Sequence, residues 1–171
     1  MSKAKLKKAL AALDKEEIIT MVIELYESRK EAKEYLDYWS DPDAEKELER
    51  VEKLAFRQLF TPQGVSRRTP SLPTLNKLIK DFMTICFEPE KVAALLIFVT
   101  ESLADWLEVR YRRLTYRTSL RKYLNEASLY VETHELEGVF GLRLERLRER
   151  VEALEQYQEE HVPRRWGWHR R

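Results

Sequence analysis

The stretch that decides the fold runs from Pro89 to Val109 and reads PEKVAALLIFVTESLADWLEV. Its first half is apolar on most sides of a helix, because eight consecutive hydrophobic residues occupy Val92–Val99. Pro89 fits the first helical turn, where no hydrogen bond is lost, and Glu88 precedes it as a candidate cap. A helix that is apolar all round belongs in the interior of a helical protein. We therefore predict a buried central helix over residues 89–109.

Amphipathic segments lie on both sides of this central helix. Asp14 followed by Glu17 is typical of a capping box, and Asp41 before Pro42 indicates another helix start. Apolar spacings of three and four residues predict helices over 13–39, 41–60, 73–86, 115–137 and 142–160. We therefore expect an all-α fold of six to seven helices in antiparallel hairpins, arranged as a short α-solenoid-like stack or an irregular helical bundle.

Proline and glycine divide the chain. The densest cluster of these breakers lies between residues 61 and 73, which predicts the main loop, and Gly138 and Gly141 predict the last helix break. We expect one helical domain over residues 1–162, followed by a basic Trp/Arg tail at 163–171.

A weak internal repeat also emerges when the chain is shifted by 74 residues. Residues 13–28 then share four identities with their counterparts, at Glu16, Ile23, Glu27 and Ser28. One interpretation is a two-repeat organisation, with repeats at about 13–60 and 87–137. The other is that any two capped amphipathic helices align this well.

Composition excludes several classes of protein. The 171 residues are 43% hydrophobic and 36% charged, which is too apolar for a disordered chain, and one cysteine cannot form an internal disulfide. The longest apolar run has eight residues, far short of the roughly 20 of a membrane-spanning helix. With no signal peptide either, we expect a cytoplasmic protein without a membrane span.

The sequence contains no recognisable set of catalytic or cofactor-binding residues. The three histidines, at 134, 161 and 169, never lie three or four residues apart, so we expect no metal site. Cys86 ends an apolar helix face without a neighbouring histidine, which indicates an inert buried thiol. Glycines are too sparse for a phosphate-binding loop. We expect no cofactor and no catalytic residue.

Charge is strongly segmented although the net charge is only +1. Residues 1–15, 110–123 and 161–171 carry net charges of +4, +6 and +4, whereas 16–60 and 124–160 each carry −6. Arg113, Arg117 and Arg121 share one face of a predicted helix. One interpretation is a nucleic-acid footprint, extended by Arg67 and Arg68. The other is pairing with the acidic helices, within one chain or between subunits.

Two further groups are candidate binding residues. Arg29 lies on the apolar stripe of the 13–39 segment, where it could clamp an anionic group in a groove. Alternatively it is paired at a helix hairpin, or its stem packs while its head reaches water. The tail places Arg164, Arg165, Trp166 and Trp168 together. Its uses could be stacking on bases, insertion at a membrane interface or docking on a groove; the alternative is a mobile tail.

The segment LDKEEIITMVIELYESRKEAKEYLDYWSDPDAEKELE, within residues 13–60, carries a resemblance. A capped apolar helix is followed by Arg29–Leu36 (RKEAKEYL) and by an Asp-Pro-Asp helix start at residues 41–43, and Leu78–Phe82 reads LIKDF. This pattern resembles a family of small, uncharacterised, all-helical bacterial proteins. The likeness covers about half of the chain and weakens after Arg110. It implies a bacterial helical domain and carries over no functional residue.

These observations favour a non-catalytic helical interaction or scaffold module that binds a protein partner or itself as a homo-oligomer. The alternative is a nucleic-acid-binding protein that uses the basic row from Arg110 to Lys122 and the C-terminal tail. A third, weaker hypothesis is an enzyme or small-ligand binder with a pocket around Arg29. Bases gathered on one face would favour nucleic acid, and bases interleaved with glutamates would favour protein contacts.

Overall fold

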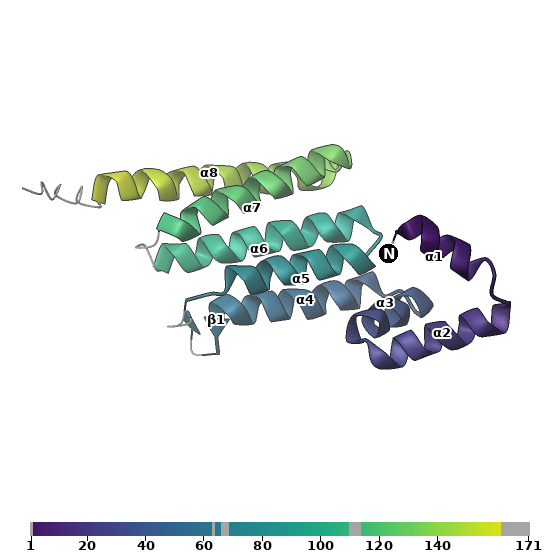
Figure 1. Ribbon diagram of the computed structural model, residues 1–171. Helices are drawn as coiled ribbons and strands as arrows, with labels where there is room; N and C mark the ends of the chain where they lie inside the picture. The colour runs from purple at the N-terminus through teal and green to yellow at the C-terminus, as the bar shows by residue number, and fades with distance from the viewer. Residues whose placement is uncertain (1, 63, 66–68, 110–113, 162–171) are drawn as a thin grey trace, which may run out of the picture. The chain divides into compact units, whose positions relative to one another are not determined.

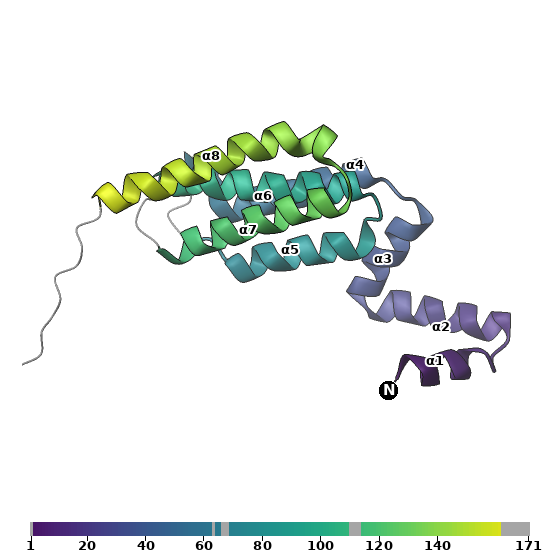
Figure 2. The ribbon, with the colours of Figure 1, turned by 90° about the horizontal axis from the view of Figure 1, so that it is seen from above.

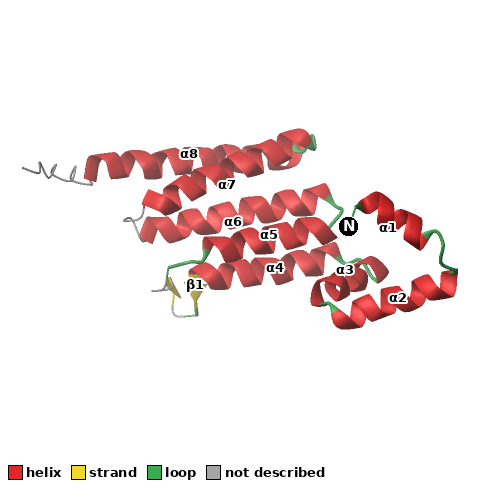
Figure 3. Cartoon of the chain, in the orientation of Figure 1, coloured by secondary structure: helices red, strands yellow, loops and turns green. Residues whose placement is uncertain are grey.

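A computed structural model describes residues 2–62, 64–65, 69–109 and 114–161. These residues form eight helices and one short hairpin (Figures 1 and 3). The elements are, in chain order, α1 (Lys3–Leu10), α2 (Lys15–Ser28), α3 (Lys30–Ser40), α4 (Ala44–Leu59), β1 (Phe60–Thr61), β2 (Gly64–Val65), α5 (Leu72–Ile85), α6 (Pro89–Val109), α7 (Leu114–Thr133) and α8 (Glu137–His161). The predicted all-α class is confirmed, and the described part has more helices than the six to seven expected. The chain groups into two compact units, Met1–Asp43 and Ala44–Arg171.

Helix α6 is the centre of the Ala44–Arg171 unit, as its sequence predicted. It contacts α4, α5, α7 and α8. Its buried residues lie on most sides of the helix and include Leu95, Ile97 and Leu103, which are completely inaccessible to solvent, whereas a narrow stripe through Phe98, Glu101 and Asp105 is half-buried or exposed. Thr100 is buried as well, and its hydroxyl donates to the Leu96 carbonyl at 2.7 Å. The apolar run therefore sets the position of this helix in the core.

Successive helices of this unit run in opposite directions, so that α4, α6 and α8 are parallel to one another (Figure 2). Ion pairs fix the register of α6 against α8: the Arg143 Nε donates to Glu101 at 2.8 Å, and the Arg150 Nε donates to Glu108 at 2.6 Å. Both pairs are 42 residues apart in sequence, as two parallel helices require. Arg150 also pairs with Asp105. These contacts join the central helix of the unit to its last helix.

The Met1–Asp43 unit departs from the prediction of one helix over 13–39. Helix α2 ends at Ser28 and α3 begins at Lys30, with extended backbone at Arg29. The break turns α3 back along α2, so that the Tyr26 hydroxyl donates to the Asp37 carboxylate at 2.8 Å. In an unbroken helix these residues would be about 16 Å apart along the axis. Helix α1 is a further element that the sequence analysis did not predict.

Other boundaries also differ from expectation. Helix α4 begins at Ala44, two residues after the predicted start at Pro42, and Asp41 instead ends α3. Inside the predicted loop, Phe60 pairs with Val65 and Thr61 with Gly64, whose φ of +113° is readily adopted only by glycine. Gly138 lies inside α8 rather than at a break. The proposed 74-residue repeat stays a prediction.

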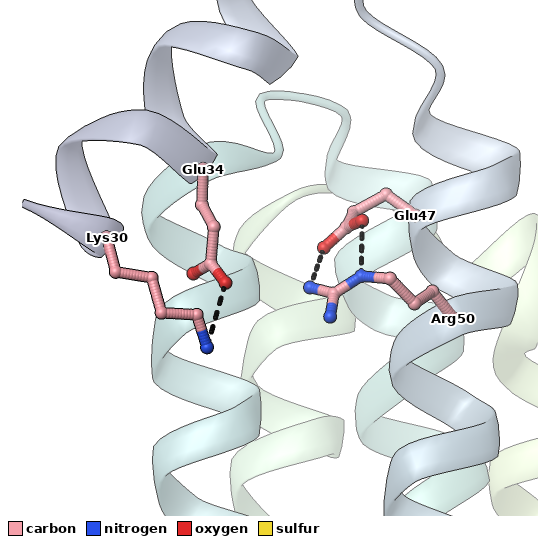
Figure 4. A network of polar contacts seen from close by, with 4 residues as sticks. All are labelled: Lys30, Glu34, Glu47 and Arg50. Atoms are coloured by element: carbon pink, nitrogen blue, oxygen red, sulfur yellow. Dashed lines mark hydrogen bonds and ion pairs between the residues drawn. The ribbon is translucent and has the colours of Figure 1, made fainter. Parts of the chain in front are cut away.

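Each unit carries short-range ion pairs on its helices (Figure 4). In α3, the Lys30 ammonium lies 3.5 Å from the Glu34 carboxylate one turn later. In α4, the Arg50 guanidinium donates to Glu47 through Nε at 2.8 Å and Nη2 at 2.5 Å. Such exposed pairs contribute at most about 1 kcal/mol each, so they support helix formation rather than the packing of the core.

Candidate protein-interaction surface

A capping box stabilises the N-terminus of helix α2. The Asp14 carboxylate accepts from the Glu17 backbone N–H at 2.8 Å, and the Glu17 carboxylate accepts from the Asp14 backbone N–H at 2.9 Å. This is the capping box that the sequence predicted, and it satisfies two of the N–H groups that a helix start leaves without partners.

The apolar side chains of α2 cover an unusually wide arc. At 100° per residue, the hydrophobic residues from Ile18 to Tyr26 occupy about 200° of the circumference. A surface helix that packs on a single core needs little more than 100°. The opposite arc holds the polar residues Glu16, Glu17, Thr20, Glu24 and Glu27. The width of the apolar arc therefore suits contact with more than one neighbour.

One of those neighbours is α3. Besides the Tyr26–Asp37 hydrogen bond, the Lys33 ammonium lies 5.4 Å from the centre of the Tyr26 ring. Ile18 and Tyr26 are half-buried. On the helical wheel Ile18 and Tyr26 lie 80° apart on either side of Val22, so the half-buried residues fall in the middle of the apolar arc and the more exposed residues lie toward its two edges.

The rest of the arc is open to solvent. Helices α1 and α2 contain no buried residue, and Tyr38 is the one buried side chain among residues 2–43. We call the exposed apolar side chains of α2 the α2 face; they are Ile19, Met21, Val22, Ile23 and Leu25, each 36–50% exposed. Trp39 of α3 is 67% exposed. An accessible set of large apolar side chains this dense is typical of a binding surface.

Arg29 does not have the environment that the sequence predicted. It lies at the junction of α2 and α3 and is exposed, rather than on the buried stripe of a continuous helix. Its backbone N–H donates to Leu25 at 3.0 Å, and its carbonyl accepts from Lys33 at 3.0 Å. The continuous helix on which the stripe rested is broken at this residue, so Arg29 lies at a helix hairpin with an exposed side chain, and its role as an anion-binding residue stays a prediction.

The predicted arginine row is only partly within the described structure. Arg121 of α7 pairs with Glu155 of α8, its Nε donating to the carboxylate at 3.0 Å. Arg117 is half-buried, and its Nε is enclosed without a hydrogen-bond partner. The remaining candidates, Arg113, Arg164, Arg165, Trp166 and Trp168, lie outside the described residues, as do Arg67 and Arg68.

Sequence reasoning missed the arginines with the most extensive pairing. Arg143 makes two hydrogen bonds to Glu101, and these interactions raise its pKa. Arg150 pairs with both Asp105 and Glu108, which likewise raise its pKa. The acidic residues at positions 101, 105 and 108 and the arginines at 143 and 150 are evident in the sequence. Their pairing can be predicted only when α6 and α8 are known to be parallel neighbours.

A second concave surface lies on the Ala44–Arg171 unit. Side chains of α5, α6 and α7 line a groove of about 560 Å³, which we call the α5–α7 groove; they are Asn76, Ile79, Lys80, Met83, Leu96, Lys122, Glu126, Leu129, Tyr130 and Thr133. Met83 and Leu129 are exposed in it, at 43% and 62%. Lys80 lies on its α5 wall and Lys122 on its α7 wall. The groove is thus mainly apolar, with a lysine on each side and one acidic residue, Glu126, beside Lys122 on the α7 wall.

Two tyrosines of α7 connect this groove to the core. The Tyr123 hydroxyl donates to the Asn76 side-chain carbonyl at 2.7 Å, which links α7 to α5. Burial, together with the charge of Glu126, raises the Tyr123 pKa to about 12. Tyr130 packs on His134 with ring centres 4.2 Å apart, and burial raises its pKa. Both hydroxyls therefore stay protonated at neutral pH and act as hydrogen-bonding groups.

The described residues hold no cluster of three or more histidine, cysteine, aspartate or glutamate side chains suited to a metal ion. In the same residues, no helix is both long and apolar enough to cross a bilayer. Cys86 is buried, with its Sγ 3.8 Å from the Glu88 carbonyl.

Comparison with known proteins adds a family and no activity. No curated protein and no solved structure matches the chain. A family model described as a family of unknown function, DUF6155, matches residues 1–164. The predicted resemblance to an uncharacterised family is therefore confirmed, and it extends well beyond Arg110, where the sequence analysis expected it to fade. The chain belongs to this family of unknown function, DUF6155.

Proposed function

We propose that this chain is a non-catalytic helical interaction module that binds a protein partner, or a second copy of itself, through the α2 face. The observation that carries the proposal is the absence of any buried residue from α2, although its apolar arc spans about 200° of the helix.

Two physical arguments support this function. An isolated helix of 14 residues is marginal in water even with a good cap, and most helical stability comes from packing of an apolar face. A segment the size of the Met1–Asp43 unit also falls near the lower limit at which a core can support a fold without help. Covering the α2 face with a partner supplies the missing burial, worth roughly 25 cal/mol for each Å² of apolar surface removed from water.

The charge pattern supports protein contacts over nucleic acid. Arg121, Arg143 and Arg150 each pair with carboxylates of a neighbouring helix. Basic side chains that already pair with carboxylates make weaker contacts with phosphates. They therefore release fewer counterions when a nucleic acid binds. We also propose a cytoplasmic location, since the one cysteine is a buried thiol of the kind that reducing compartments maintain.

Capture of partners from a native lysate tests the function. The bait is the full chain, treated with nuclease, and compared with a Val22→Asp variant whose new charge lies in the centre of the α2 face. A matched control, Thr20→Asp, places the same charge on the polar arc of the same helix. We expect the wild type and the Thr20 variant to retain a common partner that the Val22 variant loses. Partners that vanish with nuclease, or that all three baits retain, would contradict the proposal.

A further inference from the structure

The α5–α7 groove and the α2 face are both mainly apolar and have similar lengths. The groove residues of α5 extend from Asn76 to Met83, which is eight positions or about 10 Å along the helix. The α2 face extends from Ile19 to Leu25, which is about 9 Å. One surface is a concave apolar strip and the other a convex apolar strip of nearly the same length, and in a single copy both are exposed.

The charges that border the two surfaces are complementary. Glu16 and Glu27 flank the α2 face on one side and Glu17 and Glu24 flank it on the other, as the 100° spacing of helical residues dictates. A helix lying in the groove would bring these acids beside Lys80 on one wall and Lys122 on the other. Lys80 makes no ion pair with any residue that the structure describes. Lys122 lies 3.5 Å from Glu126 in an exposed pair, which costs little to rearrange.

We propose that the α5–α7 groove binds helix α2 of a second copy of this chain, so that two copies exchange their α2 helices reciprocally. This inference rests on the proposed function and names its partner. Pairing of two α2 faces with each other is disfavoured, because it would set glutamates against glutamates on both flanks, and like charges across an interface oppose association. Reciprocal exchange gives a closed two-fold dimer rather than an open chain.

Charge exchange between the two surfaces provides the test. The groove variant carries Lys80→Glu and Lys122→Glu, and the helix variant carries Glu24→Lys and Glu27→Lys, both outside the capping box. Sedimentation velocity over a concentration series measures the dimer dissociation constant of each full-length protein. Each variant alone should dimerise at least about tenfold more weakly, because like charges then face each other at both contacts. Lys77→Glu, on an exposed α5 position outside the groove, is the matched control and should leave dimerisation unchanged.

Mixing the two variants makes the test specific to contact between copies. In a mixed pair, one contact joins a glutamate groove to a lysine helix, and the other is the wild-type contact. We therefore expect the mixture to dimerise with near wild-type affinity, and a chain carrying all four substitutions to dimerise again by itself. A wild-type protein that is monomeric throughout, or a mixture that stays monomeric, would overturn the inference.

Measuring the Val22→Asp variant both by sedimentation velocity and by lysate capture separates this inference from the proposed function. A dimer that Val22→Asp abolishes but the groove variant does not affect overturns the groove as the α2 site and leaves the α2 face as a binding surface. A monomeric protein whose lysate partner depends on Val22 overturns self-association alone. If Val22→Asp changes neither dimerisation nor capture, both proposals fail.

Discussion

Glu52 shows how single residues tune the Ala44–Arg171 unit. It lies half-buried on α4, where burial is the main cause that raises its pKa. The neighbouring carboxylates of Glu45, Glu49 and Glu101 raise the pKa further, and Arg143 opposes them. Since the charged form is disfavoured in the folded state, the folded protein holds this proton more tightly than the unfolded chain does.

The sign of the pH dependence follows from this shift. The pKa of Glu52 in the folded state exceeds its value near 4.5 in the unfolded chain, so protonation of this carboxyl stabilises the fold at low pH. That stabilisation is lost as the pH rises through the unfolded-state pKa and then through the folded-state pKa. We expect Glu52→Gln to raise the free energy of unfolding at pH 7 relative to the wild type, and to do so less at pH 4. Urea unfolding at the two pH values measures the difference. An equal effect at both would contradict the assigned pKa shift.

At the scale of elements, the turn between α7 and α8 ends a helix in a way that the sequence did not reveal. Glu135 has a φ of +57°, and the Leu136 N–H donates to the Val131 carbonyl at 2.9 Å while the Glu135 N–H donates to Glu132 at 3.1 Å. This is the hydrogen-bond pattern of a Schellman motif, in which the left-handed position is usually glycine. A glutamate there bears a steric cost that glycine avoids.

Glu135→Gly should therefore stabilise the protein by about 1 kcal/mol, because it removes the left-handed penalty of a side chain. Thermal and urea unfolding measure the gain. Glu135→Ala is the control, since alanine loses the charge but keeps the Cβ and its penalty. Stabilisation by alanine equal to that by glycine would show that charge, rather than backbone conformation, governs this turn.

Elements also show how far sequence reasoning reached. The apolar run in α6 and the Asp14–Glu17 cap of α2 are local signals, and both predictions were confirmed. The break at Arg29 was missed because the apolar spacing continues through it, and the chain turns there to join Tyr26 to Asp37. The predicted helix break at Gly138 was wrong because glycine was given too much weight. A glycine destabilises a helix by only about 1 kcal/mol, and the packing of α8 outweighs this.

The candidate site was less accessible to prediction than the fold. The sequence spacing of an apolar helical stripe is the same whether the stripe is buried in a core or exposed to solvent. The sequence alone therefore could not predict that Val22 and Leu25 are exposed. The α5–α7 groove is formed by α5 and α7, which are not consecutive in the chain, and the ion pairs of Arg143 and Arg150 likewise depend on helix order. These features follow from tertiary arrangement rather than from local pattern.

At the scale of the whole molecule, burial is distributed unevenly between the two units. The Ala44–Arg171 unit buries most of α6, whereas residues 2–43 bury one side chain and expose most of the apolar arc of α2. This uneven burial supports the proposal that α2 is a docking helix. The central claim is that the α2 face is covered by protein in the cell.

Photo-crosslinking in living cells tests that claim most directly. A photoreactive residue replaces Val22 on the α2 face in one full-length protein and Thr20 on the polar arc in another. Irradiation should yield a discrete higher-mass adduct from position 22 and none, or only a diffuse background, from position 20. Equal crosslinking from both positions, or no adduct from position 22, would contradict the assignment of the α2 face as a binding surface.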